Sequence, residues 1–399
     1  MGWLEAARRV ETVVGGGGVP GAVLIAGVGE EEPRLVLACG RTGQPGPLAP
    51  VTPDTVFDLA SLTKVVATLP TVLRLVDQGE IGLDDTVRRH LPDFAGAGKD
   101  RVTVRMLLAH TAGLPNHRAY HERPGTPRDH LTAVLAEPLV EAPGSVVCYS
   151  DLGFILLGEI AARVAGASLD RAAHELVFAP LGLAETRFRP PAEWRPRIAA
   201  TEAPPGGEPR LGVVHDGNAG ALGGVAGHAG LFSTASDVAR YLRSCWVSSE
   251  SPLFSSQLRA EALRCQTEGL DGRRGLGWTL RGDRWDHMSV EWPSTGAGHT
   301  GFTGTSVAFD AAGGLWAVLL TNAVHLGRDA REIISLRRQV HDALAQDLAN
   351  GGVPDASAPG WIATSLNVAD LDVADLYVAA PDGLADDRNH RRRPDAGNR

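Results

Sequence analysis

The chain has 399 residues, with 38 Lys and Arg against 47 Asp and Glu, and this acidic balance excludes the basic footprint of a nucleic-acid-binding protein. No apolar run reaches membrane-spanning length, and the four cysteines lack the spacing of a zinc site or a disulfide framework. The N-terminus lacks the charged-then-apolar pattern of a signal peptide, so we expect a cytoplasmic protein unless a leader was removed.

The first eighty residues predict a helix, a β-hairpin and a second helix. Residues 3–14 have amphipathic helical spacing and end at a run of glycines. The β-rich runs 22–28 and 34–40 flank an acidic turn, which is typical of a hairpin. A proline-containing loop over 41–55 leads to an extended segment that meets a helix at Ser61. We expect Pro70 to kink that helix or to end its first half.

The rest of the chain changes character twice. Residues from about 80 to 275 predict helices and long loops, strands return after 275, and a long helix follows over 328–348. Strands and a helix at both ends, around a helical insertion, favour an α+β fold with one sheet built from both termini.

These patterns predict three parts. They are an α/β sheet domain over 1–80 and 275–348, a mainly helical domain over 81–274, and a C-terminal tail over 349–399. The tail is rich in Asp, Ala, Pro and Arg, and we expect little or no fixed structure there.

Ser61 and Lys64 stand at the start of the second predicted helix, one turn apart, so their side chains can touch. A serine at a helix start can simply cap the free N–H groups. The lysine has no comparable explanation, because the chain has 36 Arg and only two Lys, Lys64 and Lys99. Arg cannot give up its proton in a protein, whereas a buried Lys can act as a base. The pair therefore predicts a nucleophilic serine activated by a desolvated lysine.

Three stretches together resemble the motifs of the serine β-lactamase and penicillin-binding protein superfamily. The similarity is to its class C-like branch of low-molecular-weight DD-peptidase, amidase, esterase and transacylase relatives, over roughly residues 5–348. The stretches are Ser61-Leu62-Thr63-Lys64, Tyr149-Ser150-Asp151 and His299-Thr300-Gly301. The resemblance implies a β-lactamase/transpeptidase-like fold, with an antiparallel sheet flanked by helices and an all-helical insertion, and no cofactor.

The resemblance also implies roles for single residues. Ser61 would attack a carbonyl and form an acyl-enzyme, Lys64 would take or relay its proton, and Tyr149 would act as second base and then as acid. Alternatively, Tyr149 is a buried phenol next to the apolar helix 152–165. The oxyanion hole would be formed by the backbone N–H groups of Ser61 and Phe302. Thr300 and Gly301 would support it on an edge strand, where Gly301 lets a substrate backbone approach closely.

The motifs depart from the family pattern at two positions. Asp151 stands where the family has Asn, which removes a donor to a substrate amide and suggests that Asp151 holds Lys64 charged. His299 stands where the family has Lys, so a fixed cation becomes a group that is only partly charged near neutral pH. Both changes argue against β-lactams and free C-terminal carboxylates as substrates.

Other histidines have simpler interpretations. His215, Asp216 and His228 could suggest a metal site, but no Cys or carboxylate cluster completes one, so we favour hydrogen bonding within loops and expect no metal. His110 lies in a Thr-Ala-Gly-Leu-Pro context and indicates a structural turn.

Three functions remain open. The first is a serine hydrolase of esterase, amidase or peptidase type that acts on a small-molecule ester, amide or peptide. The second is an acyltransferase of the same fold that passes the acyl group to an amine or alcohol in natural-product biosynthesis. The third is a catalytically silent binding protein. The sequence does not indicate the acyl group, the acceptor or the oligomeric state.

Overall fold

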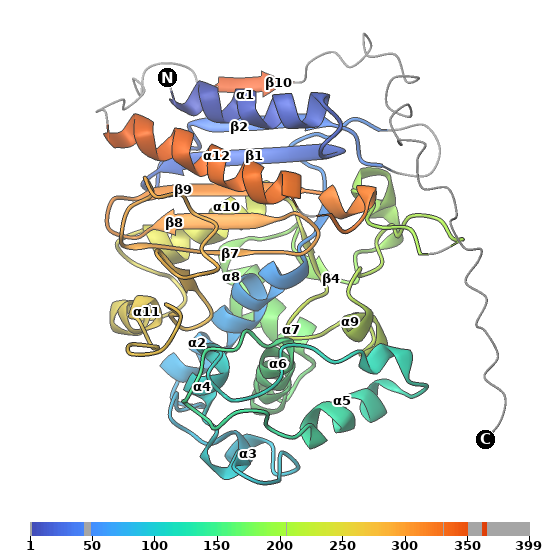
Figure 1. The fold of residues 1–399 in the computed structure, drawn as a ribbon, viewed down its shortest axis with the longest axis vertical. Coiled ribbons are helices and arrows are strands. Elements are labelled where there is room, and N and C mark those ends of the chain that lie inside the picture. Colours follow the sequence, from blue (N-terminus) through green and yellow to red (C-terminus); the bar gives the residue numbers. More distant parts are fainter. Residues whose placement is uncertain (1, 44–48, 205, 330, 350–360, 365–399) are drawn as a thin grey trace, which may run out of the picture. The chain divides into compact units, whose positions relative to one another are not determined.

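The computed structural model describes residues 2–43, 49–204, 206–329, 331–349 and 361–364. Its main feature is a seven-stranded sheet in the order β10-β2-β1-β9-β8-β7-β6 (Figure 1). The strands are β1 (Gly21–Val28), β2 (Leu35–Gly40), β6 (Thr279–Leu280), β7 (Gly296–Thr300), β8 (Ser306–Asp310), β9 (Leu315–Thr321) and β10 (Trp361–Thr364). Neighbours are antiparallel except β10 and β2, which are parallel. The α+β class and the sheet from both chain ends are confirmed.

Both faces of this sheet are covered at β1, which is apolar at every position. In β1, Val23 and Ile25 pack into one core while Ala22, Leu24 and Ala26 pack into the other. Successive side chains of a strand point to opposite faces, so a continuous apolar run predicts cover on both sides. The register pairs Val23 with both Ala38 and Leu320, which fixes the central three strands.

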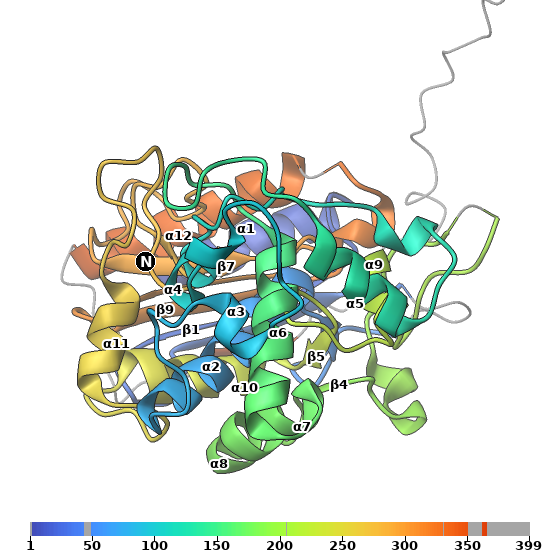
Figure 2. The ribbon, with the colours of Figure 1, turned by 90° about the horizontal axis from the view of Figure 1, so that it is seen from below.

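Helices α1 (Gly2–Gly15) and α12 (Arg331–Ala349) pack against each other over one face of the sheet (Figure 1). Helix α10 (Ala235–Leu242) packs against β1 and β9 and belongs to the core of the other face. The helical region is built around the buried helix α6 (Asp151–Ala165) (Figure 2). Its other helices are α2 (Leu69–Asp77), α3 (Val87–His90), α4 (Val104–Leu108), α5 (Pro127–Ala136), α7 (Leu169–Ala173), α8 (Ala179–Leu181), α9 (Gly217–Ala221) and α11 (Ser256–Leu263).

Among the described residues, no single helix has the length and apolar composition to cross a membrane. The bent pair formed by α6 and Leu169–Leu181 meets the criterion by length and composition only. Helix α6 lies within the protein core, where Leu152, Leu156 and Ile160 are fully buried.

A second, three-stranded sheet has the order β3-β5-β4 and joins the helical region to the nucleophile segment. It consists of β3 (Phe57–Asp58), β4 (Arg187–Phe188) and β5 (Leu231–Ser233). Two of these strands interrupt the mainly helical part predicted over 81–274. One apolar core runs from the large sheet into the helical region, and the division into two domains stays a prediction. Within the predicted tail 349–399, residues 361–364 form β10, while 350–360 and 365–399 lie outside the described residues.

Candidate active site

The segment that carries Ser61 and Lys64 leaves β3 and winds differently from the helix predicted there. A 3₁₀ turn over Ala60–Leu62 is followed by a π-helical turn over Lys64–Thr68, and only then by α2. Pro70 lies in the first turn of α2, directly after the π turn in which the Leu69 N–H donates to the Lys64 carbonyl, and a proline cannot donate such a bond itself. The predicted kink at Pro70 is therefore a change of helix type one turn earlier, and such π turns are frequent at functional sites.

Lys64 is fully buried, and its ammonium group donates three hydrogen bonds. The acceptors are Ser61 Oγ at 3.0 Å, Asp151 Oδ1 at 2.8 Å and the carbonyl of His228 at 3.1 Å. An ammonium group has three hydrogens, so all of its donors are used. The predicted contact between Ser61 and Lys64 is present.

Lys64 is paired with Asp151, the residue that the sequence suggested would hold it charged. Burial by itself lowers the pKa of a lysine, but the Asp151 carboxylate and Tyr149 together outweigh burial and raise the pKa of Lys64 to about 12. Lys64 is therefore an ammonium at neutral pH and must lose a proton before it can accept one from Ser61.

Asp151 is held at the N-terminus of α6, where the helix dipole favours a negative charge. Ser150 caps this helix by accepting from the Gly153 N–H at 3.3 Å. Although burial disfavours a carboxylate, the Lys64 ammonium holds the pKa of Asp151 well below its usual range. The second carboxylate oxygen, Oδ2, lies 3.4 Å from His117 Nδ1, a contact that sequence reasoning did not anticipate.

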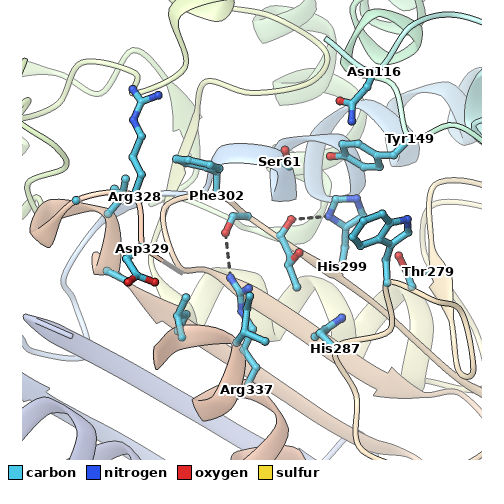
Figure 3. A pocket seen from close by; sticks show the side chains of 18 of the residues that line it. Ser61, Asn116, Tyr149, Thr279, His287, His299, Phe302, Arg328, Asp329 and Arg337 are labelled. Carbon is cyan, nitrogen blue, oxygen red and sulfur yellow. Dashed lines mark hydrogen bonds between the residues drawn. The ribbon is translucent and has the colours of Figure 1, made fainter. Parts of the chain in front are cut away.

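Tyr149 and His299 lie next to each other beside the same cavity as Ser61 (Figure 3). The Lys64 Nζ is 5.0 Å from the centre of the Tyr149 ring, and the His299 ring centre is 6.0 Å away. On the other side the ring packs at 4.6 Å against His110. His110 has a φ of +59° and its Nδ1 accepts from the Ser150 N–H at 3.1 Å, which fits the turn predicted for it.

His299 is buried on β7, and its charge state corrects the expectation. Burial, with Lys64 and Arg274 nearby, lowers the pKa of His299 to about 3. Its Nδ1 contacts the Thr300 carbonyl at 2.9 Å, while Nε2 has no partner among the described residues. His299 is therefore neutral near pH 7 and not partly charged.

The turn after β7 presents Phe302 and is tied to the segment just before Ser61. The hydroxyls of Thr303 and Thr305 donate to the carbonyls of Asp58 at 2.7 Å and Leu59 at 3.0 Å. The two predicted oxyanion donors, Ser61 and Phe302, thus lie on segments that these hydrogen bonds hold together. Their role stays a prediction. Gly301 has an internal reason to be glycine, because an added Cβ would lie 2.1 Å from Thr305 Oγ1 and 2.5 Å from the Leu59 carbonyl.

Ala60 precedes the nucleophile in the left-handed region, with a φ of +46°. The buried carboxylate of Asp58 stabilises this conformation by accepting from the Ala60 N–H at 2.8 Å and the His215 N–H at 2.7 Å. Burial raises the pKa of Asp58. A non-glycine residue in this conformation is strained, and such strain gathers at functional sites.

The cavity in front of Ser61 has a volume of about 350 Å³. Its apolar lining includes Trp285, Phe302 and Ile334, and its floor includes the buried side chain of Arg337 (Figure 3). Arg337 donates to the carbonyls of Gly301 at 3.0 Å and Thr305 at 2.8 Å, and burial lowers its pKa to about 10. Sequence reasoning missed Arg337, although its spacing from Ile333 puts a charge on the apolar stripe of α12.

The histidines considered for a metal site have other partners. His215 Nε2 lies 2.9 Å from Glu202 Oε2, and His228 Nε2 lies 2.9 Å from Asp216 Oδ1. In the part of the chain that the structure describes, no three or more His, Cys, Asp or Glu side chains gather so as to hold a metal ion.

Comparisons with known proteins agree with this geometry. Residues 6–342 match the Beta-lactamase family. A putative D-alanyl-D-alanine carboxypeptidase of Escherichia coli is 31% identical over 314 residues, which cover 69% of this chain and 70% of that protein. A relative of the same name from Salmonella agona is 32% identical over 314 residues, with 69% and 71% covered.

Solved structures show the same fold. EstCE1, a hydrolase with promiscuous acyltransferase activity, is 25% identical with a TM-score of 0.69, covering 85% of this chain and 99% of its own. A class C β-lactamase is 20% identical with a TM-score of 0.66, covering 85% and 97%. From the family match and the identity to these relatives, this chain belongs to the Beta-lactamase family.

Proposed function

We propose that this protein is a serine acyl-transfer hydrolase that forms an acyl-enzyme on Ser61 and cleaves an ester or amide bond. The observation that carries the proposal is the 3.0 Å contact between Ser61 Oγ and a fully buried Lys64, beside a cavity large enough for a small acyl group. Acyl transfer needs a nucleophile with a proton acceptor in reach, and these two residues supply both.

The bonds change in a simple order. The Ser61 oxygen attacks the carbonyl carbon, its proton passes to Lys64 once that residue is an amine, and the carbonyl electrons move to the oxygen. In the proposal this oxyanion is bound by the N–H groups of Ser61 and Phe302. Collapse expels the leaving group, which takes a proton through Lys64 and Tyr149. Water repeats the sequence and releases the acid.

The proposal places no fixed cation for a substrate carboxylate at position 299. His299 is neutral where the family has a cation, because burial lowers its pKa to about 3. Arg274 pairs with Asp283 at 3.1 Å and Arg328 with Glu202 at 3.0 Å, whereas Arg337 donates to the Gly301 and Thr305 carbonyls and stays charged near pH 7. The relatives named as carboxypeptidases therefore do not fix the substrate class of this chain.

The test is covalent labelling. The protein is incubated with p-nitrophenyl acetate, p-nitrophenyl butyrate and a fluorophosphonate, and the adduct is located by mass spectrometry. We expect one adduct on Ser61 and none in Ser61→Ala. An adduct on another residue contradicts the role of Ser61, and the absence of any adduct in the wild type contradicts the proposal and favours a silent binding protein.

A second candidate is transfer of the acyl group to an amine or alcohol. It is favoured by the structural similarity to EstCE1, whose title names both hydrolase and acyltransferase activity, and by the apolar lining of the cavity. Product analysis with an ester donor and rising acceptor concentration separates the two. Acid as the only product supports the hydrolase, and dominant amide or ester at millimolar acceptor supports transfer.

A further inference from the structure

The acyl-transfer mechanism leaves one requirement unmet: Lys64 must become an amine. Its three ammonium hydrogens are all engaged, and Asp151 favours the charged form. A mechanism in which Lys64 accepts the Ser61 proton therefore needs a device that weakens the hold of Asp151 on Lys64.

His117 is placed to do this. Its Nδ1 lies 3.4 Å from Asp151 Oδ2, the carboxylate oxygen not used by Lys64, and its side chain is 44% exposed to solvent. The imidazole thus joins the fully buried Lys64, through one carboxylate, to the protein surface.

Two hydrogen bonds hold the loop before His117 against the residues at the start of α6. The Asp151 N–H donates to the Asn116 carbonyl at 2.9 Å, and the Ser150 hydroxyl donates to the Pro115 carbonyl at 2.7 Å. These two bonds fasten the 115–117 loop to the first turn of α6, so the contact does not depend on the histidine side chain alone.

We propose that His117 is a positioning residue for acyl transfer, which shares Asp151 with Lys64 and, when protonated, lets Lys64 become the amine that activates Ser61. This inference rests on the proposed function. It also accounts for aspartate at position 151, because a carboxylate offers one acceptor oxygen to each of the two cations, whereas the amide that the family has there carries an NH2 group in place of the second oxygen.

The proton count balances. In one arrangement Lys64 is an ammonium and His117 is a neutral imidazole whose Nδ1–H donates to Asp151. In the other, Lys64 has lost an N–H proton through the Ser61 hydroxyl to solvent in the cavity, and His117 has gained one from solvent at Nε2. Both arrangements hold the same number of protons, so the pair titrates as a unit.

The charged groups that face His117 favour its protonated form. The negative charges of Asp151 on α6 and of Asp216 in the segment before α9 raise the pKa of His117. The positive charge of Arg118, in the same loop as His117, lowers it. The hydrogen bond to Asp151 outweighs burial and raises the pKa of His117. Asp216 is itself paired with His228.

The coupling predicts a distinctive pH dependence. In the wild type the reactive arrangement persists as the pH falls, because protonation of His117 replaces the cation that Asp151 loses. With a residue at position 117 that cannot titrate, the fraction of Lys64 amine falls tenfold for every pH unit. Coupling of one pKa unit corresponds to about a tenfold difference at low pH.

The experiment compares the wild type with His117→Gln, which keeps a donor to Asp151 but has no titration, and with His174→Gln, an exposed histidine elsewhere. The burst of p-nitrophenol from p-nitrophenyl acetate is followed from pH 6 to 9. We expect His117→Gln to be about five- to tenfold slower at pH 6 and equal to the wild type at pH 9, with His174→Gln unchanged throughout.

A second measurement does not need activity. In Ser61→Ala, the titration of His117 is followed by NMR with and without Asp151→Asn, and we expect the substitution to lower the pKa of His117 by about one unit. A rate ratio that is constant from pH 6 to 9, or no effect at any pH, overturns the inference. Absence of any Ser61 adduct instead contradicts the proposed function.

Discussion

The two lysines of this chain are both buried, yet their surroundings shift the pKa values of the two ammonium groups in opposite directions. Lys64 is 0% exposed and contacts the Asp151 carboxylate, and its pKa is raised to about 12. Lys99 is 1% exposed, donates to the Leu135 carbonyl at 2.6 Å and lies 4.5 Å from the centre of the Phe94 ring. Burial lowers the pKa of Lys99, and the more distant Glu137 offsets this only in part.

The difference shows that burial alone does not make a lysine into a base. The end of helix α5 and an aromatic face stabilise the Lys99 cation weakly, through partial charges. A carboxylate in direct contact reverses the effect of desolvation at Lys64. At neutral pH Lys64 is therefore not a free amine but one half of an ion pair with Asp151. The residues around this pair determine how easily Lys64 loses a proton.

Replacing each lysine by arginine gives the largest contrast. Lys64→Arg keeps the charge but cannot accept the Ser61 proton, so we expect acylation by p-nitrophenyl acetate to fall by about 10² to 10⁴. The matched variant Lys99→Arg should stay within about twofold of the wild type. If Lys64→Arg retains more than about a tenth of the rate, Lys64 is only an electrostatic support.

Removing the carboxylate should make Lys64 resemble Lys99. In Asp151→Asn the buried ammonium loses its anion, so its pKa falls and the amine forms at lower pH. We expect the midpoint of the pH–rate profile for acylation to move down by at least about one unit, which is a tenfold change in the amine fraction at pH 7. An unchanged midpoint would show that Asp151 does not set the charge of Lys64.

A third buried lysine can be introduced at the position where the family has one. His299→Lys supplies a cation to a site that is neutral in the wild type, and we expect acylation by a penicillin to rise about tenfold. Acylation by the uncharged p-nitrophenyl acetate serves as the control and should not rise. Equal gains for both substrates would contradict the role assigned to His299.

The smallest effect concerns stability at Lys99. Because burial lowers the pKa of Lys99 in the folded chain below its ordinary value, the unfolded chain binds a proton that the folded chain does not, at pH values between the two pKa values. Relative to Lys99→Met, the wild type should therefore gain stability as the pH rises toward 10. Chemical denaturation at pH 7, 8.5 and 10 measures this, and a constant difference would exclude a lowered pKa.

Local patterns in the sequence predicted much of the fold. The hairpin, the helix that became α6 and the sheet from both termini follow from apolar spacing, which burial on one or two faces imposes directly. The π turn at Lys64–Thr68 was not predictable, because its residues have ordinary helical propensities. Strands β4 and β5 are too short to show periodicity and form through pairing with each other and with β3.

The residues that gather around the cavity and the pairing of Asp151 with Lys64 could be predicted from the sequence, whereas the neutral state of His299 could not. Ser61, Lys64, Tyr149 and His299 lie together beside one cavity or in direct contact with its lining. Their ionisation depends on neighbours far away in sequence, such as Asp151 for Lys64, 87 residues on. The contact of His117 with Asp151 arises from a loop packed on a helix end, and no spacing rule in the sequence indicates it.

Ala60 has a consequence for directed evolution of this protein. Its φ of +46° costs an alanine about 1–2 kcal/mol, which glycine would not bear. Glycine would also widen the range of conformations open to the peptide that carries the Ser61 N–H. A library of variants selected for survival of heating should therefore accumulate Ala60→Gly. A library selected for turnover should retain alanine at this position.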